Sequence, residues 1–221
     1  MTNEEIFCRI DHTLLRAVSS WTEIKQLCDE AVRFKTASVC IPPSYVKPVH
    51  ETYGASLNIC TVVGFPLGYN LCPVKVMETE QALTGGAGEI DMVINLGDVK
   101  NGCFDRVLEE ISAVKKACGN KILKVIIETC YLSDEEKIRL CGIVTQAGAD
   151  YIKTSTGFGT AGAVIADIEL FKQHIGANVK IKAAGGIKTR QDLEAFINAG
   201  ASRIGTSSAV ALLAGNSAVG Y

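Results

Sequence analysis

The chain has 221 residues, and its 22 Lys and Arg against 24 Asp and Glu give a formal net charge of −2 at pH 7. With 48% hydrophobic and 21% charged residues it has the composition of a globular protein, and at this length it buries enough surface to fold without metals or disulfides. Its basic residues are scattered among acidic ones, which excludes the basic stripe that a nucleic-acid partner requires.

Targeting segments are not evident in the sequence. No apolar run approaches the roughly 18 to 20 residues of a membrane span, and the opening MTNEEIF lacks the basic and apolar regions of a signal peptide. The nine cysteines form no Cys-x-x-Cys pair and mostly lie in apolar runs. We therefore expect reduced and buried thiols, no metal site, no membrane partner and a cytoplasmic protein.

Short β-rich runs alternate with amphipathic stretches along the whole chain. The eight predicted strands are Cys8 to His12, Ser38 to Ile41, Asn58 to Val63, Glu89 to Asn95, Ile122 to Glu128, Ala149 to Lys153, Val179 to Ala183 and Ser202 to Gly205. Between them, helix starts are indicated by capping boxes at Ser20-x-x-Glu23 and Ser133-x-x-Glu136, by the similar Thr189-x-x-Asp192, and by Pro73.

This alternation predicts a single-domain (β/α)8 barrel, a TIM barrel, spanning residues 1–221. An open, doubly wound sheet is the competing architecture. The glycines disfavour it, because no G-x-G-x-x-G follows the first strand and the glycine-rich turns come after the seventh and eighth strands. Those late turns are where such barrels bind phosphate.

Two lysines end neighbouring predicted strands, Lys153 the sixth and Lys182 the seventh. Active sites of such barrels lie at the carboxyl ends of the strands, so both ammonium groups are expected at one site. Like charges in a partly dry pocket disfavour protonation, which leaves one lysine as a neutral, nucleophilic amine near pH 7. Lys180 shares the strand parity of Lys182 but is expected near the other end of the barrel, solvated.

A third candidate, Asp91, is a carboxylate within the apolar fourth strand. A buried acid needs a partner, which is either a cation or a substrate hydroxyl. Lys124 and Glu128 on the fifth strand share one parity, and both are candidates to point inward. A purely structural ion pair between Asp91 and Lys124 is the alternative to a catalytic role.

Two glycine turns predict phosphate binding. Gly185-Gly186-Ile187 precedes a helix near Thr189, and Gly205-Thr206-Ser207-Ser208 precedes another. Backbone N–H groups at such turns, with hydroxyls beside them, bind anions without arginine. The predicted partner is thus a phosphorylated small molecule.

With these segments the chain resembles the deoxyribose-phosphate aldolases, class I aldolases that need no cofactor. The resemblance runs nearly end to end and is carried by segments such as Ile10-Asp11-His12-Thr13-Leu14, Val39-Cys40-Ile41-Pro42-Pro43, Glu89-Ile90-Asp91-Met92-Val93, Tyr151-Ile152-Lys153-Thr154-Ser155-Thr156-Gly157 and Lys182-Ala183-Ala184-Gly185-Gly186. The combination of Lys-Thr-Ser-Thr-Gly with Lys-x-x-Gly-Gly is its most specific part.

The resemblance implies reversible cleavage of 2-deoxy-D-ribose 5-phosphate to D-glyceraldehyde 3-phosphate and acetaldehyde. Lys153 would form the Schiff base, Lys182 would keep its amine neutral, and Asp91 would work with Lys182 and a water in proton transfer. Gly157, Gly185, Gly186, Gly205, Ser207 and Ser208 match the phosphate cradle, whereas Thr13, Lys124 and Thr156 match supporting positions. No metal or other cofactor is implied, and relatives suggest a homodimer.

Three points stay open on the sequence. The terminal Tyr221 matches a tail residue that assists proton transfer in relatives, or belongs to a disordered tail. Cys40 either lines the pocket or serves as a small hydrophobe. A phosphosugar isomerase or a non-catalytic phosphate-binding barrel would share the glycine turns, but would place a carboxylate or histidine base, or no such lysine pair, at the strand ends.

Overall fold

The computed structural model describes residues 1–214, and within them eight parallel strands close into a barrel in sequence order. The strands are β1 (Ile10–Thr13), β2 (Ser38–Ile41), β3 (Ile59–Val63), β4 (Glu89–Val93), β5 (Ile122–Ile126), β6 (Tyr151–Lys153), β7 (Lys180–Ala184) and β8 (Arg203–Thr206). Pairing of β1 with both β2 and β8 closes the sheet. The predicted (β/α)8 barrel is confirmed, and the open sheet is excluded.

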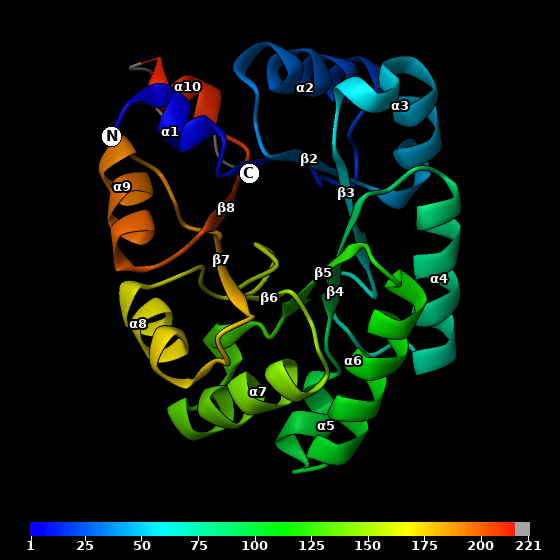
Figure 1. Ribbon diagram of the computed structural model, residues 1–221, viewed down its shortest axis with the longest axis vertical. Coiled ribbons are helices and arrows are strands. Elements are labelled where there is room, and N and C mark those ends of the chain that lie inside the picture. Colours follow the sequence, from blue (N-terminus) through cyan, green and yellow to red (C-terminus); the bar gives the residue numbers. More distant parts are fainter. Residues whose placement is uncertain (215–221) are drawn as a thin grey trace.

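Helices surround the barrel (Figure 1). They are α1 (Asn3–Phe7), α2 (Trp21–Phe34), α3 (Val46–Tyr53), α4 (Cys72–Thr84), α5 (Leu96–Lys100), α6 (Phe104–Cys118), α7 (Asp134–Gln146), α8 (Ile165–His174), α9 (Arg190–Ala199) and α10 (Ala209–Leu213). No helix along residues 1–214 combines the length and hydropathy that a membrane crossing requires.

The predicted helix starts are confirmed. Ser20, Ser133 and Thr189 each accept a hydrogen bond from the backbone of the residue three positions on, whose carboxylate accepts one in return. These reciprocal bonds satisfy N–H groups that the first helical turn leaves unpaired. Pro73 lies in the first turn of α4, where its missing N–H costs nothing.

Several strand boundaries differ from the prediction by one to two residues. The first strand begins at Ile10 rather than Cys8, because an unpredicted capping box of Thr2 and Glu5 starts the helix α1 ahead of it. The fourth ends at Val93, since Asn95 caps α5. The fifth ends at Ile126, and the seventh and eighth each start and end one residue later than predicted.

The apolar core has two parts. The larger lies between the barrel wall and the helices, and a smaller cluster of Leu15, Cys40, Cys60 and Val62 packs with Phe65. All nine cysteines are free, but the expectation of buried thiols holds for only part of them: Cys8 is exposed, and Cys72, Cys103 and Cys130 are half-buried. Cys72 and Cys103 lie at helix starts and Cys130 lies in a short 3-10 helix, so none of the three is in a strand.

Candidate active site

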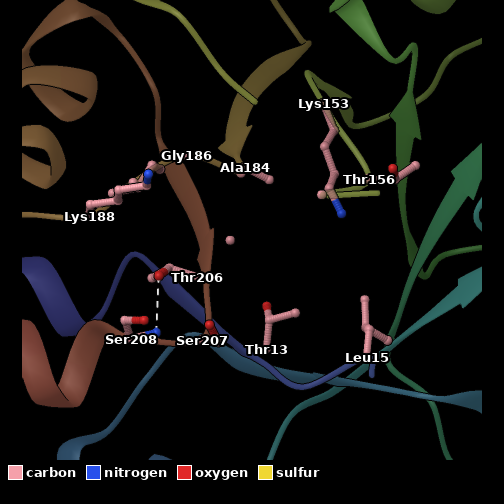
Figure 2. A pocket seen from close by; sticks show the side chains of 14 residues that line it. Thr13, Leu15, Lys153, Thr156, Ala184, Gly186, Lys188, Thr206, Ser207 and Ser208 are labelled. Carbon is pink, nitrogen blue, oxygen red and sulfur yellow. Dashed lines mark hydrogen bonds between the residues drawn. The ribbon is translucent and has the colours of Figure 1, made fainter. Parts of the chain in front are cut away.

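A cavity of about 380 Å³ opens at the carboxyl ends of the strands (Figure 2). Nine of the predicted site residues line it: Thr13, Lys153, Thr156, Gly157, Gly185, Gly186, Gly205, Ser207 and Ser208. The predicted Lys182, Asp91 and Lys124 do not line it and lie buried in the barrel. Tyr221 lies outside the described residues. The cavity wall thus comes from β1, β6, β7 and β8 and the turns that follow them.

Lys153 is the lysine that reaches the cavity from the barrel interior. It ends β6, only 3% of its surface is exposed, and its Nζ donates to Asp91 Oδ2 at 2.7 Å. In Figure 2 its side chain projects inward beside Thr156. A lysine so placed is desolvated and yet accessible to a ligand, as a nucleophilic amine must be.

Lys182 does not line the cavity but lies fully buried beside Lys153 in the strand register. Its Nζ donates to Asp11 Oδ2 at 2.5 Å and to Asp91 Oδ2 at 2.6 Å. Burial alone would favour the neutral amine, but these two carboxylates raise the pKa of Lys182 above its ordinary value. Lys182 is therefore held as a cation.

Asp91 joins three lysines. Its Oδ1 accepts from Lys124 at 2.8 Å, whereas its Oδ2 accepts from both Lys153 and Lys182. Burial opposes ionisation, yet the three ammonium groups hold the pKa of Asp91 well below its usual range. The ion pair between Asp91 and Lys124 exists, but it is one part of a network that includes both strand-end lysines.

The β7–α9 turn has the backbone that only glycine adopts readily. Gly185 and Gly186 have φ of 80° and 75°, in the left-handed region. The loop after β6 lies directly against this turn, because a Cβ on Gly162 would come within 2.3 Å of the Gly185 backbone. The turn thus exposes main-chain groups to the cavity, beside a loop that has no room for a side chain at Gly162.

Gly205 has a role that the sequence did not reveal. A Cβ there would lie 3.1 Å from Lys182 Cε and 3.1 Å from Ala184 Cβ. The missing side chain on β8 therefore leaves room for the stem of Lys182, in addition to lining the cavity.

Two hydrogen bonds to the Glu128 carboxylate hold Thr156 in place. Its N–H donates to Glu128 Oε1 at 3.1 Å, its hydroxyl donates to Oε2, and the hydroxyl accepts from Phe158 N at 3.0 Å. Glu128 has a left-handed φ of 52°, so the backbone leaves the strand direction after β5. Of the two residues predicted to point inward, Lys124 lies in the barrel and Glu128 supports the loop after β6.

The sequence reasoning missed two residues of this region. Asp11 was quoted in the resembling segment without a role, although its position two residues before Thr13 gives it the same strand parity. Lys188 lines the cavity opposite Lys153 (Figure 2) and follows the glycine turn directly. Lys180, expected to be solvated, is exposed.

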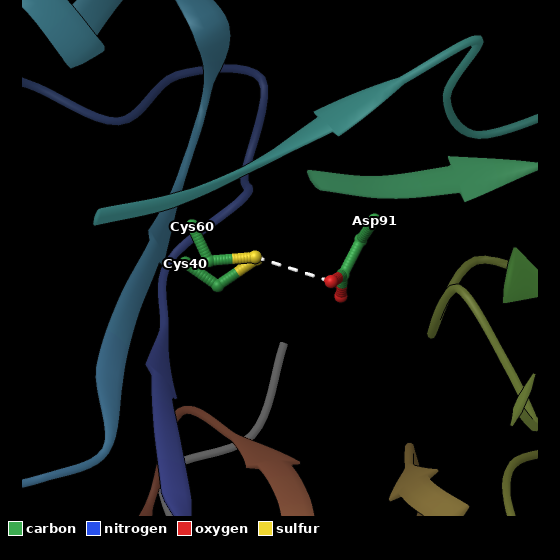
Figure 3. A group of neighbouring side chains, drawn as sticks. All are labelled: Cys40, Cys60 and Asp91. Carbon is green, nitrogen blue, oxygen red and sulfur yellow. Dashed lines mark hydrogen bonds between the residues drawn. The ribbon is translucent and has the colours of Figure 1, made fainter. Parts of the chain in front are cut away.

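Metal binding does not suit the cluster of Cys40, Cys60 and Asp91 (Figure 3), one of two groups of possible metal ligands among the described residues. Their ligand atoms lie within 4.8 Å of one another, but Asp91 already accepts from three lysines. Burial first, and neighbouring groups second, raise the pKa of Cys60 well above its usual value, so its thiol stays protonated and donates to Asp91. A divalent cation here would face three positive charges.

Comparisons with known proteins agree with this geometry. Residues 6–218 match the model of the DeoC/LacD family aldolases. The chain is 62% identical over 221 residues to the deoxyribose-phosphate aldolase of Clostridium botulinum strain Alaska E43, covering 100% of both chains. It is 54% identical over 218 residues to that of Clostridioides difficile, covering 99% of this chain and 100% of the other.

A solved structure shares the barrel. The deoxyribose phosphate aldolase of Aeropyrum pernix superposes with a TM-score of 0.90 at 31% identity, over 96% of this chain and 91% of that one. Sequence and fold similarity thus extend over essentially the full length. The chain belongs to the DeoC/LacD aldolase family.

Proposed function

We propose that this protein is a deoxyribose-phosphate aldolase that cleaves 2-deoxy-D-ribose 5-phosphate reversibly to D-glyceraldehyde 3-phosphate and acetaldehyde. The observation that carries the proposal is the position of Lys153, whose amine reaches the cavity and contacts a carboxylate shared with a second, charged lysine.

Schiff-base formation follows from this arrangement. The neutral amine of Lys153 attacks the C1 aldehyde of the open-chain sugar, and loss of water gives an iminium ion. Lys182, held as a cation between Asp11 and Asp91, disfavours a second positive charge beside it and so favours the neutral amine. The network also supplies the proton that the departing hydroxyl requires.

Carbon–carbon cleavage uses the iminium as an electron sink. A base removes the proton of the C3 hydroxyl, the C2–C3 bond breaks, and D-glyceraldehyde 3-phosphate leaves while an enamine stays on Lys153. We assign proton movement to Asp91 and Lys182 with a water, since Oδ2 of Asp91 accepts hydrogen bonds from both Lys153 and Lys182. Protonation of the enamine and hydrolysis then release acetaldehyde.

The phosphate is expected at the opposite wall from Lys153. Main-chain groups of Gly157, Gly185 and Gly186 and the hydroxyls of Ser207 and Ser208 line this part of the cavity, and Lys188 adds an ammonium group. Backbone donors arranged around a concave turn bind anions. A cavity of about 380 Å³ is within the range of small-ligand sites.

The rival isomerase would need a histidine or carboxylate base in the cavity. None of the three histidines, all of which the structure describes, lines it, and His12 instead contacts Glu30 at 2.8 Å. The cavity lining favours amine chemistry over enolisation by a general base.

Two further proposals concern the setting of the enzyme. Nine unpaired cysteines suit a reducing compartment, which supports a cytoplasmic location. Association into a homodimer stays a prediction from the resemblance, with the oligomeric state in solution as its test.

Borohydride trapping tests the mechanism. Wild-type protein incubated with 2-deoxy-D-ribose 5-phosphate and sodium borohydride should gain a reduced adduct by intact-mass spectrometry, with peptide mapping to Lys153. Lys153→Ala should gain none, whereas Lys188→Met, which removes another lysine of the same cavity, should still be labelled at saturating substrate. A wild-type protein that binds the sugar phosphate but gives no adduct would contradict the proposal.

A further inference from the structure

Charged side chains fill the barrel beneath the cavity. In the contact network that the described residues form there, three carboxylates, Asp11, Glu89 and Asp91, face four cationic groups, Lys124, Lys153, Lys182 and Arg203. The network carries one excess positive charge when every member is ionised. The fourth cation, Arg203, has no part in the chemistry proposed above.

Arg203 begins β8 at the end of the barrel away from the cavity. Its Nη1 donates to Asp11 Oδ1 at 2.5 Å and to Glu89 Oε2 at 3.1 Å, and its side chain is 11% exposed. Its guanidinium also lies 5.6 Å from the centre of the Tyr151 ring. Arg203 is thereby fixed by three strands other than its own.

Both carboxylates that Arg203 contacts also contact the lysines around Asp91. Asp11 binds Lys182 through its other oxygen, and Glu89 Oε2 lies 2.5 Å from Lys124. Arg203 therefore neutralises part of the negative charge of Asp11 and Glu89. Without Arg203, these two carboxylates would act on the lysines alone.

We propose that Arg203 is a positioning residue of the aldolase reaction: it supplies the fourth positive charge of the barrel interior, and this charge keeps the Lys153 amine unprotonated. The inference rests on the Schiff-base role proposed for Lys153. Without Arg203, three carboxylates would face three lysines, and the network would be balanced only with Lys153 protonated.

The expected size of the effect of Arg203 on Lys153 follows from the distance between their two charges. Arg203 pairs with Lys182 in the sheet register, and Lys182 pairs with Lys153, so two strand spacings separate the two charges. Two spacings amount to about 10 Å. At an effective dielectric constant of about 20, a charge at that distance shifts a titration by about one pH unit.

Other charged groups around these residues contribute to the same titration. Four groups face Lys153: Asp91 on β4, Lys182 on β7, Glu128 after β5 and the Cys40 thiol on β2. Four groups face Arg203: Asp11 on β1, Glu89 on β4, Tyr151 on β6 and Lys182 on β7. The variants below leave all of them in place except Glu89.

The test is the pH dependence of kcat/KM, which reports the free enzyme. In Arg203→Met the acid-side midpoint should move up by about one pH unit, since Lys153 then loses its proton only at higher pH. Arg203→Lys keeps the charge and should leave the midpoint near that of the wild type. The double variant Arg203→Met with Glu89→Gln restores one excess positive charge and should return the midpoint toward the wild-type value.

Two more variants make the test independent of folding defects. Glu89→Gln alone removes one negative charge and should move the midpoint to lower pH, the opposite direction. Lys180→Met is the matched control, because Lys180 lies 5.8 Å from the same Tyr151 ring but is exposed, so its removal should not move the midpoint.

The outcomes separate the two proposals. The role of Arg203 is supported if the midpoint rises in Arg203→Met, falls in Glu89→Gln and stays near the wild-type value in Arg203→Lys and in the double variant. Equal shifts in Arg203→Lys and Arg203→Met, or no shift in Arg203→Met and Glu89→Gln, would overturn it and leave Arg203 as a structural residue. Failure of the proposed function itself would appear separately, as an absence of any borohydride adduct on the wild-type protein.

Discussion

One oxygen of Asp91, Oδ2, lies 2.7 Å from the Nζ of Lys153, and the same oxygen accepts from Lys182 at 2.6 Å. A single carboxylate oxygen therefore bridges the lysine that reaches the cavity and the lysine buried beneath it. Lys153 and Lys182 are register partners on the adjacent strands β6 and β7, so the fold itself places both amines near Asp91.

The variant Asp91→Asn removes the negative charge of the bridging group but keeps the size of the side chain. We expect kcat/KM to fall by at least about 100-fold, because proton transfer by a positioned group contributes about 10² to 10⁴-fold. Three lysines would also lose their common counter-charge. Steady-state cleavage assays at pH 7, with circular dichroism to confirm folding, measure the effect.

A matched control for Asp91→Asn is Asp150→Asn. Asp150 also pairs with a lysine, Lys115, at 2.5 Å, but outside the cavity. Its loss should lower stability and leave kcat/KM within about twofold. Equal losses of activity in both variants would show that the effect of Asp91 is general destabilisation.

The variant Lys182→Leu tests the charged partner of Lys153. It removes the cation between Asp11 and Asp91, and those two carboxylates would then favour a proton on Lys153. We expect a loss in kcat/KM of about 10³-fold, with borohydride trapping slowed rather than abolished because Lys153 remains. A variant that folds and retains more than about a tenth of wild-type activity would contradict the role of Lys182.

The variant Gly205→Ala tests how tightly Lys182 is placed. The new methyl would lie 3.1 Å from Lys182 Cε, so the lysine must move by a few tenths of an ångström. Misplacement of a reacting group by 1 Å costs about 100-fold, so we expect a loss of about tenfold in kcat. A change in KM alone would instead indicate that Gly205 serves only to bind phosphate.

The pattern of the chain predicted the barrel because short β-rich runs alternate with amphipathic stretches, several of which begin with a capping signal. Ser20, Ser133 and Thr189 are local signals, and the structure confirms all three as N-caps. Strand ends were less accurate because they depend on competing local signals. Thr2 and Glu5, for example, begin a helix that delays the first strand to Ile10.

Some residues of the site can be predicted from the sequence, and others cannot. Lys153 and the glycine turns lie at strand ends, where parity and position identify them. The contact of Arg203 with Asp11 joins residues 192 positions apart and exists only because β8 pairs with β1. The left-handed backbone at Glu128 likewise cannot be seen in strand parity, and it brings that carboxylate to Thr156 rather than into the barrel.

Acid stability should depend on the buried carboxylates. Burial raises their pKa, but the surrounding cations outweigh it and hold the pKa of Asp11 and of Asp91 below the ordinary value of 3.8 in the folded protein. As the pH falls below about 4, the unfolded chain takes up protons that the folded protein does not, so the free energy of unfolding decreases. This stabilisation is present above pH 4 and is lost on acidification.

Thermal melts between pH 6 and pH 3 measure this dependence. Asp11→Asn removes one of the two carboxylates, so its melting temperature should be lower at pH 6 and should decline less steeply below pH 4 than that of the wild type. Glu51→Gln is the control, since Glu51 is exposed and its nearest cation, Lys47, lies 3.8 Å away. If Asp11→Asn and wild type lost stability in parallel below pH 4, the ion pairs of Asp11 would contribute nothing to the acid sensitivity of the fold.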